Sequence, residues 1–155
     1  MISVRQFNDP YDLRTFQAVL TAYEGTFPIA PVLHQILTNT GLMHMFIAID
    51  DATHPGTVVG AGVLKTPEAA VPIGAEIRPL AWVVSDMVTH PNYRRLGVAR
   101  VLLRHMEEVV DHNGGRIIYL YTKRTNGPAK SLYEKAGFER LRNQGSQAIY
   151  AKLTR

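Results

Sequence analysis

The chain is 155 residues long, which is the length of one domain, so we expect a single domain over residues 1–155. Hydrophobic residues make up 46% of the chain and charged residues 19%, a composition that excludes intrinsic disorder. No apolar run approaches the roughly 18 residues of a membrane span, and the first residues lack the apolar segment of a signal peptide, so no membrane partner is expected. Cysteine is absent, which excludes disulfides and cysteine-bound intermediates and fits a reducing, cytoplasmic compartment.

The net charge of +4 is unevenly distributed along the chain. Residues 1–77 contain three basic and seven acidic residues, a net charge of −4, whereas residues 78–155 contain fourteen basic and six acidic residues, a net charge of +8. This asymmetry predicts that an anionic ligand meets the C-terminal half. Nucleic acid and a phosphate-bearing cofactor are the two candidates.

The N-terminal half is predicted to begin with a strand, followed by two helices and a strand hairpin. The helices follow from apolar residues at roughly helical spacing, and the hairpin follows from two short apolar runs around a turn-rich loop. In chain order these elements cover residues 2–7, 9–23, 32–41, and 45–49 with 57–64.

The C-terminal half is predicted to alternate strands with helices after an irregular, proline-rich segment. Its first helix carries an apolar stripe and a polar side, and Pro128 opens its second helix. In chain order the segments cover residues 66–79, 80–89, 98–110, 116–122, 128–137 and 148–153. The whole chain therefore has the order β-α-α-β-β-β-α-β-α-β, which predicts an α/β fold with a mixed sheet.

The most informative stretch runs from Val88 to Ala99, where a strand ends, a basic turn with Arg94 and Arg95 follows, and a helix begins near Gly97. The first turn of a helix has unpaired N–H groups and the positive end of the helix dipole. Small residues at this point let phosphate oxygens approach the backbone. The stretch therefore predicts an anion site, although it contains neither a Gly-x-x-x-x-Gly-Lys loop nor a Gly-x-Gly-x-x-Gly fingerprint.

The C-terminal half contains two motifs. The first is Arg94-x-x-Gly97-x-Ala99, and the second is Asn126-x-x-Ala129-x-x-Leu132-Tyr133-x-Lys135-x-Gly137-Phe138. Both resemble motifs of the GCN5-related N-acetyltransferases, the GNAT family, and the first is similar to the loop that holds the pyrophosphate of acetyl-CoA in that family. Together they cover residues 80–140, and the order of elements fits the family over the whole chain. One departure is Arg95, because many members have glycine directly after the motif arginine.

The resemblance implies a mostly antiparallel central sheet with flanking helices, in which two neighbouring parallel strands splay apart. The pantetheine arm of acetyl-CoA would lie between residues 86–89 and 120–122. Backbone groups of Met87 and Val88 would bind this arm and polarise the thioester carbonyl, and Asn126 would contact it or order its own loop. The residues implied to hold the pyrophosphate are Arg94, Arg95, Leu96, Gly97, Val98 and Ala99.

Tyr133 is implied by the same resemblance to be the general acid that protonates the departing CoA thiolate. A tyrosine suits this role because it is a hydrogen-bond donor that stays protonated well above neutral pH. Without the motif, a tyrosine at this position is more simply a half-buried residue of an amphipathic helix. The match to the second motif favours the catalytic interpretation.

The group that deprotonates the acceptor amine has three candidates in the sequence. Asp86 comes first because it lies on the strand beside the expected reaction centre, and relay through water is the alternative. Glu24 and Glu76 lie in segments expected to shape the acceptor site. Positions 82, 84, 86 and 88 share one face of a regular strand, so Trp82 is expected to line the same cavity as Asp86.

The expected activity is transfer of an acetyl group from acetyl-CoA to a primary amine by direct attack in a ternary complex. The acceptor is a small molecule or a peptide, and its identity and the range of acyl groups stay open. No metal is expected, because His105 and His112 fall in the apolar stripe of their helix. A homodimer fits the family. The alternative is a non-catalytic module that binds CoA or nucleic acid, although the chain has no nucleic-acid recognition motif.

Overall fold

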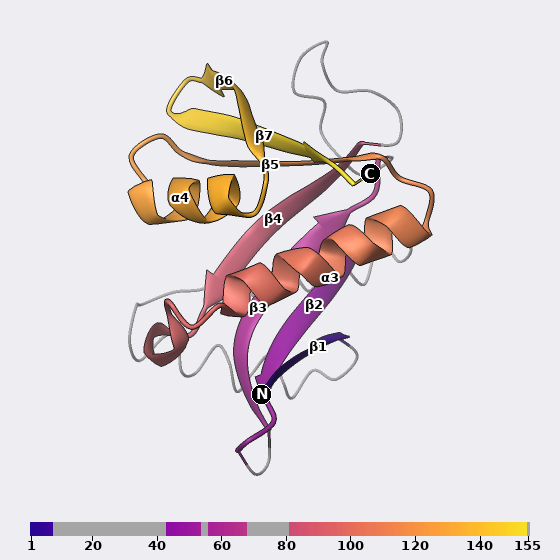
Figure 1. The fold of residues 1–155 in the computed structure, drawn as a ribbon, viewed down its shortest axis with the longest axis vertical. Helices are drawn as coiled ribbons and strands as arrows, with labels where there is room; N and C mark the ends of the chain where they lie inside the picture. Colours follow the sequence, from indigo (N-terminus) through magenta and orange to yellow (C-terminus); the bar gives the residue numbers. More distant parts are fainter. Residues whose placement is uncertain (8–42, 54–55, 68–80, 155) are drawn as a thin grey trace.

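The computed structural model describes residues 1–7, 43–53, 56–67 and 81–154 (Figure 1). Seven strands in this part of the chain form one sheet with the order β1-β2-β3-β4-β5-β7-β6. The strands are β1 (Ile2–Gln6), β2 (Met43–Asp50), β3 (Thr57–Lys65), β4 (Ala81–Thr89), β5 (Ile117–Lys123), β6 (Glu139–Gln144) and β7 (Gln147–Leu153). The helical elements are the short 3₁₀ turn η1 (Pro91–Tyr93) and the helices α3 (Val98–His112) and α4 (Gly127–Lys135).

The sheet is antiparallel at every junction between described neighbours except the one between β4 and β5, which is parallel. This confirms the expected mixed α/β fold with a mostly antiparallel sheet and one parallel pair. The two helices predicted at 9–23 and 32–41 lie outside the described residues. No described helix has the length and apolar character that a membrane crossing requires.

Strand β6 was not predicted from the sequence, which has no strand between the last helix and the last strand in its predicted order. Five of its six residues are exposed and the sixth is half-buried, so it shows no apolar alternation. It forms the edge of the sheet and is held by backbone pairing with β7. Its turn did carry a usable pattern, because Gly145-Ser146 is a common two-residue hairpin loop and Gly145 has a φ of 59°.

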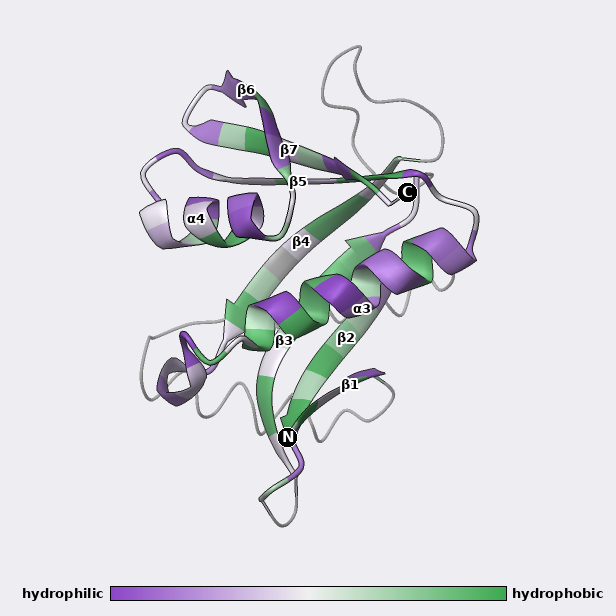
Figure 2. Ribbon diagram, viewed as in Figure 1, coloured by the Kyte–Doolittle hydropathy of each residue, from purple (hydrophilic) through white to green (hydrophobic). Residues whose placement is uncertain are grey.

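Helix α3 covers one face of the sheet and closes the main core (Figure 1). Five of its side chains are buried, and each contributes about 1.5–3 kcal/mol by leaving water. Figure 2 shows the polar side of the helix turned outward from the sheet. The buried set, spaced three or four residues apart, is Val98, Leu102, Leu103, Met106 and Val110.

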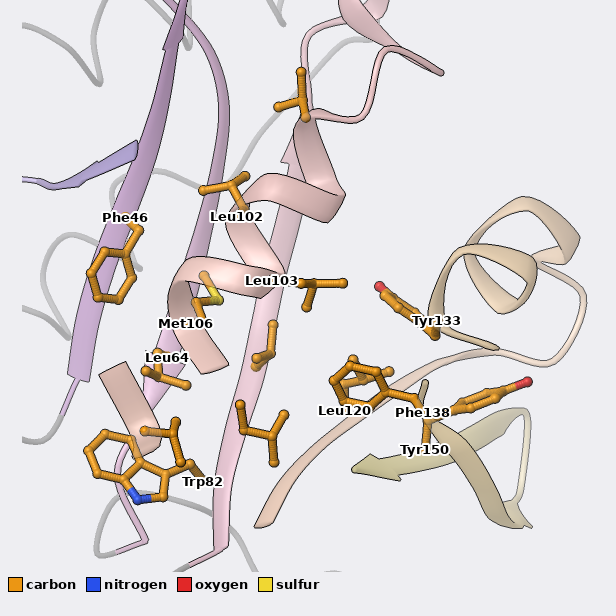
Figure 3. Close-up of a cluster of buried hydrophobic side chains, with 14 of the residues drawn as sticks. Phe46, Leu64, Trp82, Leu102, Leu103, Met106, Leu120, Tyr133, Phe138 and Tyr150 are labelled. Atoms are coloured by element: carbon orange, nitrogen blue, oxygen red, sulfur yellow. The ribbon is translucent and has the colours of Figure 1, made fainter. Parts of the chain in front are cut away.

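The sheet buries side chains on both of its faces. The largest cluster lies on the side of α3 and α4 and includes Phe46, Leu102 and Tyr150 (Figure 3). Two smaller clusters, represented by Ile47 and Tyr119, contain none of the described helical residues. Strands β2 to β5 therefore run as largely apolar segments, which is why short apolar runs were sufficient to predict them.

Candidate active site

Strands β4 and β5 are paired at one end and separate at the other. Three pairs join them, the last between Val83 and Tyr119. Beyond that pair, β4 continues to Thr89 and β5 continues to Lys123 with no backbone pairing between them. Each strand keeps its outer partner to the end, since β4 pairs with β3 at Thr89 and β5 pairs with β7 at Lys123. The facing edges of the two strands are therefore not joined to each other, which leaves room for an extended ligand to form backbone hydrogen bonds between them.

A bulge in β4 lies at the point where the strands separate. Ser85 pairs with Val63 and Val88 pairs with Ala61, so two residues of β4 lie opposite the single residue Gly62. An extra residue of this kind bends the strand and reverses the alternation of its side chains. The reversal is visible in the packing, because Met87 contacts the cluster on the α3 side and Val88 contacts the cluster on the opposite face.

The bulge corrects the prediction that positions 82, 84, 86 and 88 share one face of the strand. Trp82 and Val84 belong to the cluster on the α3 side, so regular alternation would also put Val88 there, and it does not. Trp82 is 7% exposed and packs against Gly115, so its indole is part of the core at the paired end of β4. Asp86 lies in the bulge itself, and its side chain is outside the described part of the structure.

The loop before α3 has an unusual backbone at two positions. Arg95 has a φ of 63° and Gly97 has a φ of 84°, both in the left-handed region. This region suits glycine and costs an ordinary residue about 1–2 kcal/mol. Arg95 is the position at which the chain departs from the family motif, and its backbone has the conformation that glycine adopts without strain.

The first turn of α3 presents unpaired amides to solvent. The first bond of the helix runs from the N–H of Val101 to the carbonyl of Gly97, over 3.0 Å. Gly97 caps the helix without a side chain, and no acidic residue lies in the first turn. The preceding N–H groups of the helix, together with exposed Arg94 and Arg95, can therefore bind an anion such as a pyrophosphate.

The same loop is anchored to the hairpin of β2 and β3. The N–H of His90 donates to Val59 O over 2.7 Å, and the Tyr93 hydroxyl donates to Asp50 Oδ2 over 2.7 Å. Nδ1 of His90 accepts from the N–H of Asn92 over 3.0 Å. Burial lowers the pKa of His90, which favours the neutral ring that can accept this bond, and the Tyr93 hydrogen bond lowers the pKa of Asp50. These contacts fix the loop, so His90 has a structural role.

Tyr133 projects from α4 into the region where the two strands separate. Its side chain is 8% exposed, and its ring lies 6.2 Å from that of Phe138 and 6.1 Å from that of Tyr150. Figure 3 shows the hydroxyl pointing away from α4 toward Leu103 of α3. No described residue forms a hydrogen bond with this hydroxyl. Burial raises the pKa of Tyr133 above its ordinary value of 10.0, so the hydroxyl is a protonated donor at neutral pH.

Asn126 fixes the start of the helix that carries Tyr133. Its side-chain Oδ1 accepts a hydrogen bond from the N–H of Ala129 over 3.2 Å, and Pro128 occupies the first turn. This is the ordering role, one of the two roles that the sequence suggested for Asn126.

Of the remaining predicted site residues, some lie in the described part of the chain and others lie outside it. Met87 and Val88 lie on the free stretch of β4, and exposed Leu96 lies in the loop before α3. Glu24 and Glu76 lie outside the described residues. Within the described ranges, no group of three metal-ligating side chains is found. The sequence analysis did not predict the bulge. A signal for it was present in Gly62, because a glycine inside an apolar strand often indicates a bulge or a close contact with the backbone. Met87 and Met106 lie where a side chain on Gly62 would have to be.

Residues 11–138 match the family model described as the acetyltransferase (GNAT) family. The chain belongs to the GNAT family of acetyltransferases. No curated protein matches this acetyltransferase, whereas many solved structures share its fold.

Three of these structures illustrate the likeness. The PaiA N-acetyltransferase of Thermoplasma acidophilum, solved with coenzyme A, has a TM-score of 0.70 and 20% identity, covering 99% of both chains. NAA60 of Arabidopsis thaliana, solved with acetyl-CoA, has a TM-score of 0.75 and 16% identity, covering 99% of this acetyltransferase and 98% of that chain. The ribosomal-protein-S18-alanine N-acetyltransferase of Escherichia coli has a TM-score of 0.70 and 16% identity, covering 99% and 94%. At these identities the likeness is one of fold.

Proposed function

We propose that this acetyltransferase transfers an acetyl group from acetyl-CoA to a primary amine by direct attack in a ternary complex, with Tyr133 as the general acid. The observation that carries the proposal is the separation of β4 from β5 beyond Val83 and Tyr119, together with the Tyr133 side chain, which is 8% exposed and whose hydroxyl forms no hydrogen bond with a described residue. An extended thioester between the two free strand edges would bring its sulfur toward this hydroxyl.

The residues of the described part fit the parts of acetyl-CoA. The amides of Val98 and Ala99, with Arg94 and Arg95, suit the pyrophosphate because they combine unpaired N–H groups with positive charge. The backbone of Met87 and Val88 would bind the pantetheine and polarise the thioester carbonyl. The relatives solved with coenzyme A and with acetyl-CoA support this choice of ligand.

The proposed step balances without any further reactant. The neutral amine nitrogen attacks the thioester carbonyl carbon and forms the new C–N bond, while the C–S bond breaks and its electron pair leaves on sulfur. Tyr133 supplies a proton to the sulfur, and a base takes one proton from the amine, so the products are an amide and free CoA thiol. Burial disfavours a free thiolate as well as a phenolate, so a nearby donor is more useful than in water.

A base must take the proton that the amine loses as it attacks the thioester. Asp86 remains the first candidate because it lies in the bulge at the separation of the strands. Glu24, Glu76 and water remain alternatives. Trp82 contributes through packing, because its side chain lies in the core at the paired end of β4.

The acceptor is proposed to be an amine of a peptide or a small molecule. The relative from Escherichia coli is named for acetylating an alanine of a ribosomal protein, which supports an amino acceptor. The net charge of −4 over residues 1–77 favours a cationic amine.

The experiment is an assay of acetyl-CoA turnover against a panel of amines and peptides, read by the release of free CoA thiol. The protein has no cysteine of its own to react with a thiol reagent. The Tyr133→Phe variant should lower kcat by about 10²–10⁴-fold while leaving the dissociation constant of acetyl-CoA largely unchanged. Tyr150→Phe is the matched control, because it removes a nearby tyrosine hydroxyl that already donates to Glu134 of α4.

An unchanged rate of Tyr133→Phe with a good acceptor would contradict the general-acid role. Tight binding of CoA without turnover across the panel would instead support a non-catalytic binding module.

A further inference from the structure

A hollow with a basic lining lies at the edge of the sheet, outside the proposed active site. It has a volume of about 510 Å³ and is formed by the end of β5, the turn into α4, helix α4 and the hairpin of β6 and β7. These elements meet at the end of the molecule where β6 and β7 join (Figure 1). Four cationic side chains line it, and none of its lining residues is acidic: Lys123, Arg124, Lys130 and Arg140.

None of the residues that line the hollow belongs to α3. Glu134, one turn after Lys130 on α4, accepts a hydrogen bond from Tyr150 of β7 over 3.3 Å. This face of α4 is therefore turned toward the β6–β7 hairpin. Tyr133, the residue before Glu134, points toward Leu103 of α3 (Figure 3). Tyr133 is not among the residues that line the hollow.

The hairpin is held against the end of β5, so the hollow is built by fixed backbone. The N–H of Arg124 donates to Ser146 O over 2.9 Å, and Lys123 pairs with Gln147. The ammonium of Lys130 lies 3.4 Å from the carbonyl of Arg124, which holds it over the same turn. The cations are therefore brought together by secondary structure from three separate segments.

The carboxylate of Glu134 accepts the hydrogen bond of Tyr150 and forms no ion pair with a cation of the hollow. No ion pair joins Lys123, Arg124, Lys130 or Arg140 to an acidic side chain of the described residues. Like charges gathered without a counter-ion repel each other, so a bound anion would stabilise the arrangement. Asn143 and Ser146 add neutral polar groups to the lining.

We propose that this hollow binds a phosphate monoester group. Such a group carries about 1.5–2 negative charges at neutral pH and three strong acceptor oxygens, more than a single carboxylate offers. Guanidinium groups bind phosphate oxygens in pairs, and ammonium groups add charge. Two molecules have this chemistry: a separate small phosphorylated ligand, and the CoA molecule itself through its 3′-phosphate.

The experiment measures binding and needs no acetyl transfer, so its result is independent of the proposed activity. In the first arm, AMP is titrated into the protein saturated with CoA, with adenosine as the ligand that lacks the phosphate. In the second arm, CoA and 3′-dephospho-CoA are titrated into the free protein. Both arms use calorimetry at low and high salt, because screening weakens a charge-dependent site.

The variants are Lys130→Gln and Arg140→Gln, and the matched control is Arg116→Gln. Arg116 is exposed and precedes β5, at the opposite end of that strand from the hollow. Both hollow variants should weaken binding by about tenfold, which corresponds to one lost charged hydrogen bond. If the two hollow variants bind AMP more weakly than wild type in the first arm, the site belongs to a separate phosphorylated ligand. Loss for CoA but not for 3′-dephospho-CoA assigns it to the CoA 3′-phosphate.

The proposal is overturned if both hollow variants, shown to be folded by thermal melting, stay within twofold of wild type for AMP and for CoA. It is also overturned if the hollow variants weaken the binding of a short RNA that AMP does not displace, because the basic surface would then belong to nucleic acid.

Discussion

Lys152 of β7 and Glu107 of α3 form an ion pair, with 2.6 Å between Nζ and Oε1. The same ammonium donates to the carbonyl of Ala136 at the end of α4 over 2.7 Å, and it lies 5.9 Å from the centre of the Phe138 ring. One side chain therefore links α3, which carries the proposed phosphate loop, to α4, which carries Tyr133. Both partners of the ion pair are partly exposed, so the pair adds little to the free energy of unfolding. Its main effect is to hold the two helices in a fixed relation.

Replacing this lysine should disturb the relation between the two helices. We expect Lys152→Met to lower the free energy of unfolding by about 1–2 kcal/mol, because it removes a charged hydrogen bond and an ion pair. It should also lower kcat, since Tyr133 would be held less firmly. Thermal melting and the thiol-release assay measure the two effects. Lys135→Met, at an exposed position in the last turn of α4, is the control and should change both values less.

The first turn of α3 depends on a glycine of β3. A Cβ on Gly60 would lie 2.6 Å from Val98 Cγ1 and 3.3 Å from Val88 O. We expect Gly60→Ala to destabilise the fold by about 1–3 kcal/mol and to weaken CoA binding, because the helix start must move away from the strand. Gly127→Ala, where no atom lies within 4 Å, is the control and should not be destabilised. Unchanged CoA affinity in a folded Gly60→Ala protein would contradict the role of this helix start.

Arg95 combines a useful charge with a strained backbone. Its φ of 63° favours glycine, so Arg95→Gly should have a free energy of unfolding about 1 kcal/mol higher than that of Arg95→Ala, and it should melt at a higher temperature. Both variants lack the guanidinium, so both should bind acetyl-CoA more weakly than wild type. Equal stability of the two variants would mean that the backbone at this position carries no strain.

Asn126 allows the capping role and the ligand-binding role to be separated. Asn126→Ala should cost about 1 kcal/mol of stability, because the N–H of Ala129 loses its acceptor. Asn126→Ser keeps an acceptor and should recover most of that stability. If Asn126 acts only as a cap, the serine variant will also keep the wild-type KM for acetyl-CoA. A raised KM in a fully stable serine variant would show direct contact with the cofactor.

The pH dependence of the reaction follows from the burial of Tyr133. Burial raises the pKa of Tyr133 above 10.0, so the protonated donor is present over the whole neutral range and is lost only in more alkaline solution. The acceptor amine gains reactivity as it deprotonates, given a pKa of about 10.4 for an aliphatic amine. We therefore expect kcat/KM to rise with pH from about 6 to about 9 without a descending limb. A descending limb in that range that Tyr133→Phe removes would contradict the raised pKa.

Much of the fold was predictable because its determinants are local. The apolar stripe from Val98 to Val110 specifies a helix whichever sheet it covers, and Pro128 before Gly137 brackets the next helix. The motif residues were likewise predictable in position, since Gly97 and Asn126 act on the turns in which they lie. Strand β6 was not predictable from its side chains, because an edge strand is held by backbone pairing and its residues can all face water.

The sequence by itself determined the family and the residues proposed to surround the site: the loop from Arg94 to Ala99, the cap at Asn126 and the tyrosine on the following helix. Only the tertiary structure decided that β4 and β5 separate after Val83 and Tyr119 and that Trp82 belongs to the core. It also decided that a bulge at Asp86 and Met87 reverses the alternation of side chains between the two faces of the sheet. The physical reason is that strand pairing and register depend on neighbours distant in the chain. A one-residue bulge set by the partner strand reverses every side chain beyond it, and the periodicity of β4 alone contains no record of that partner.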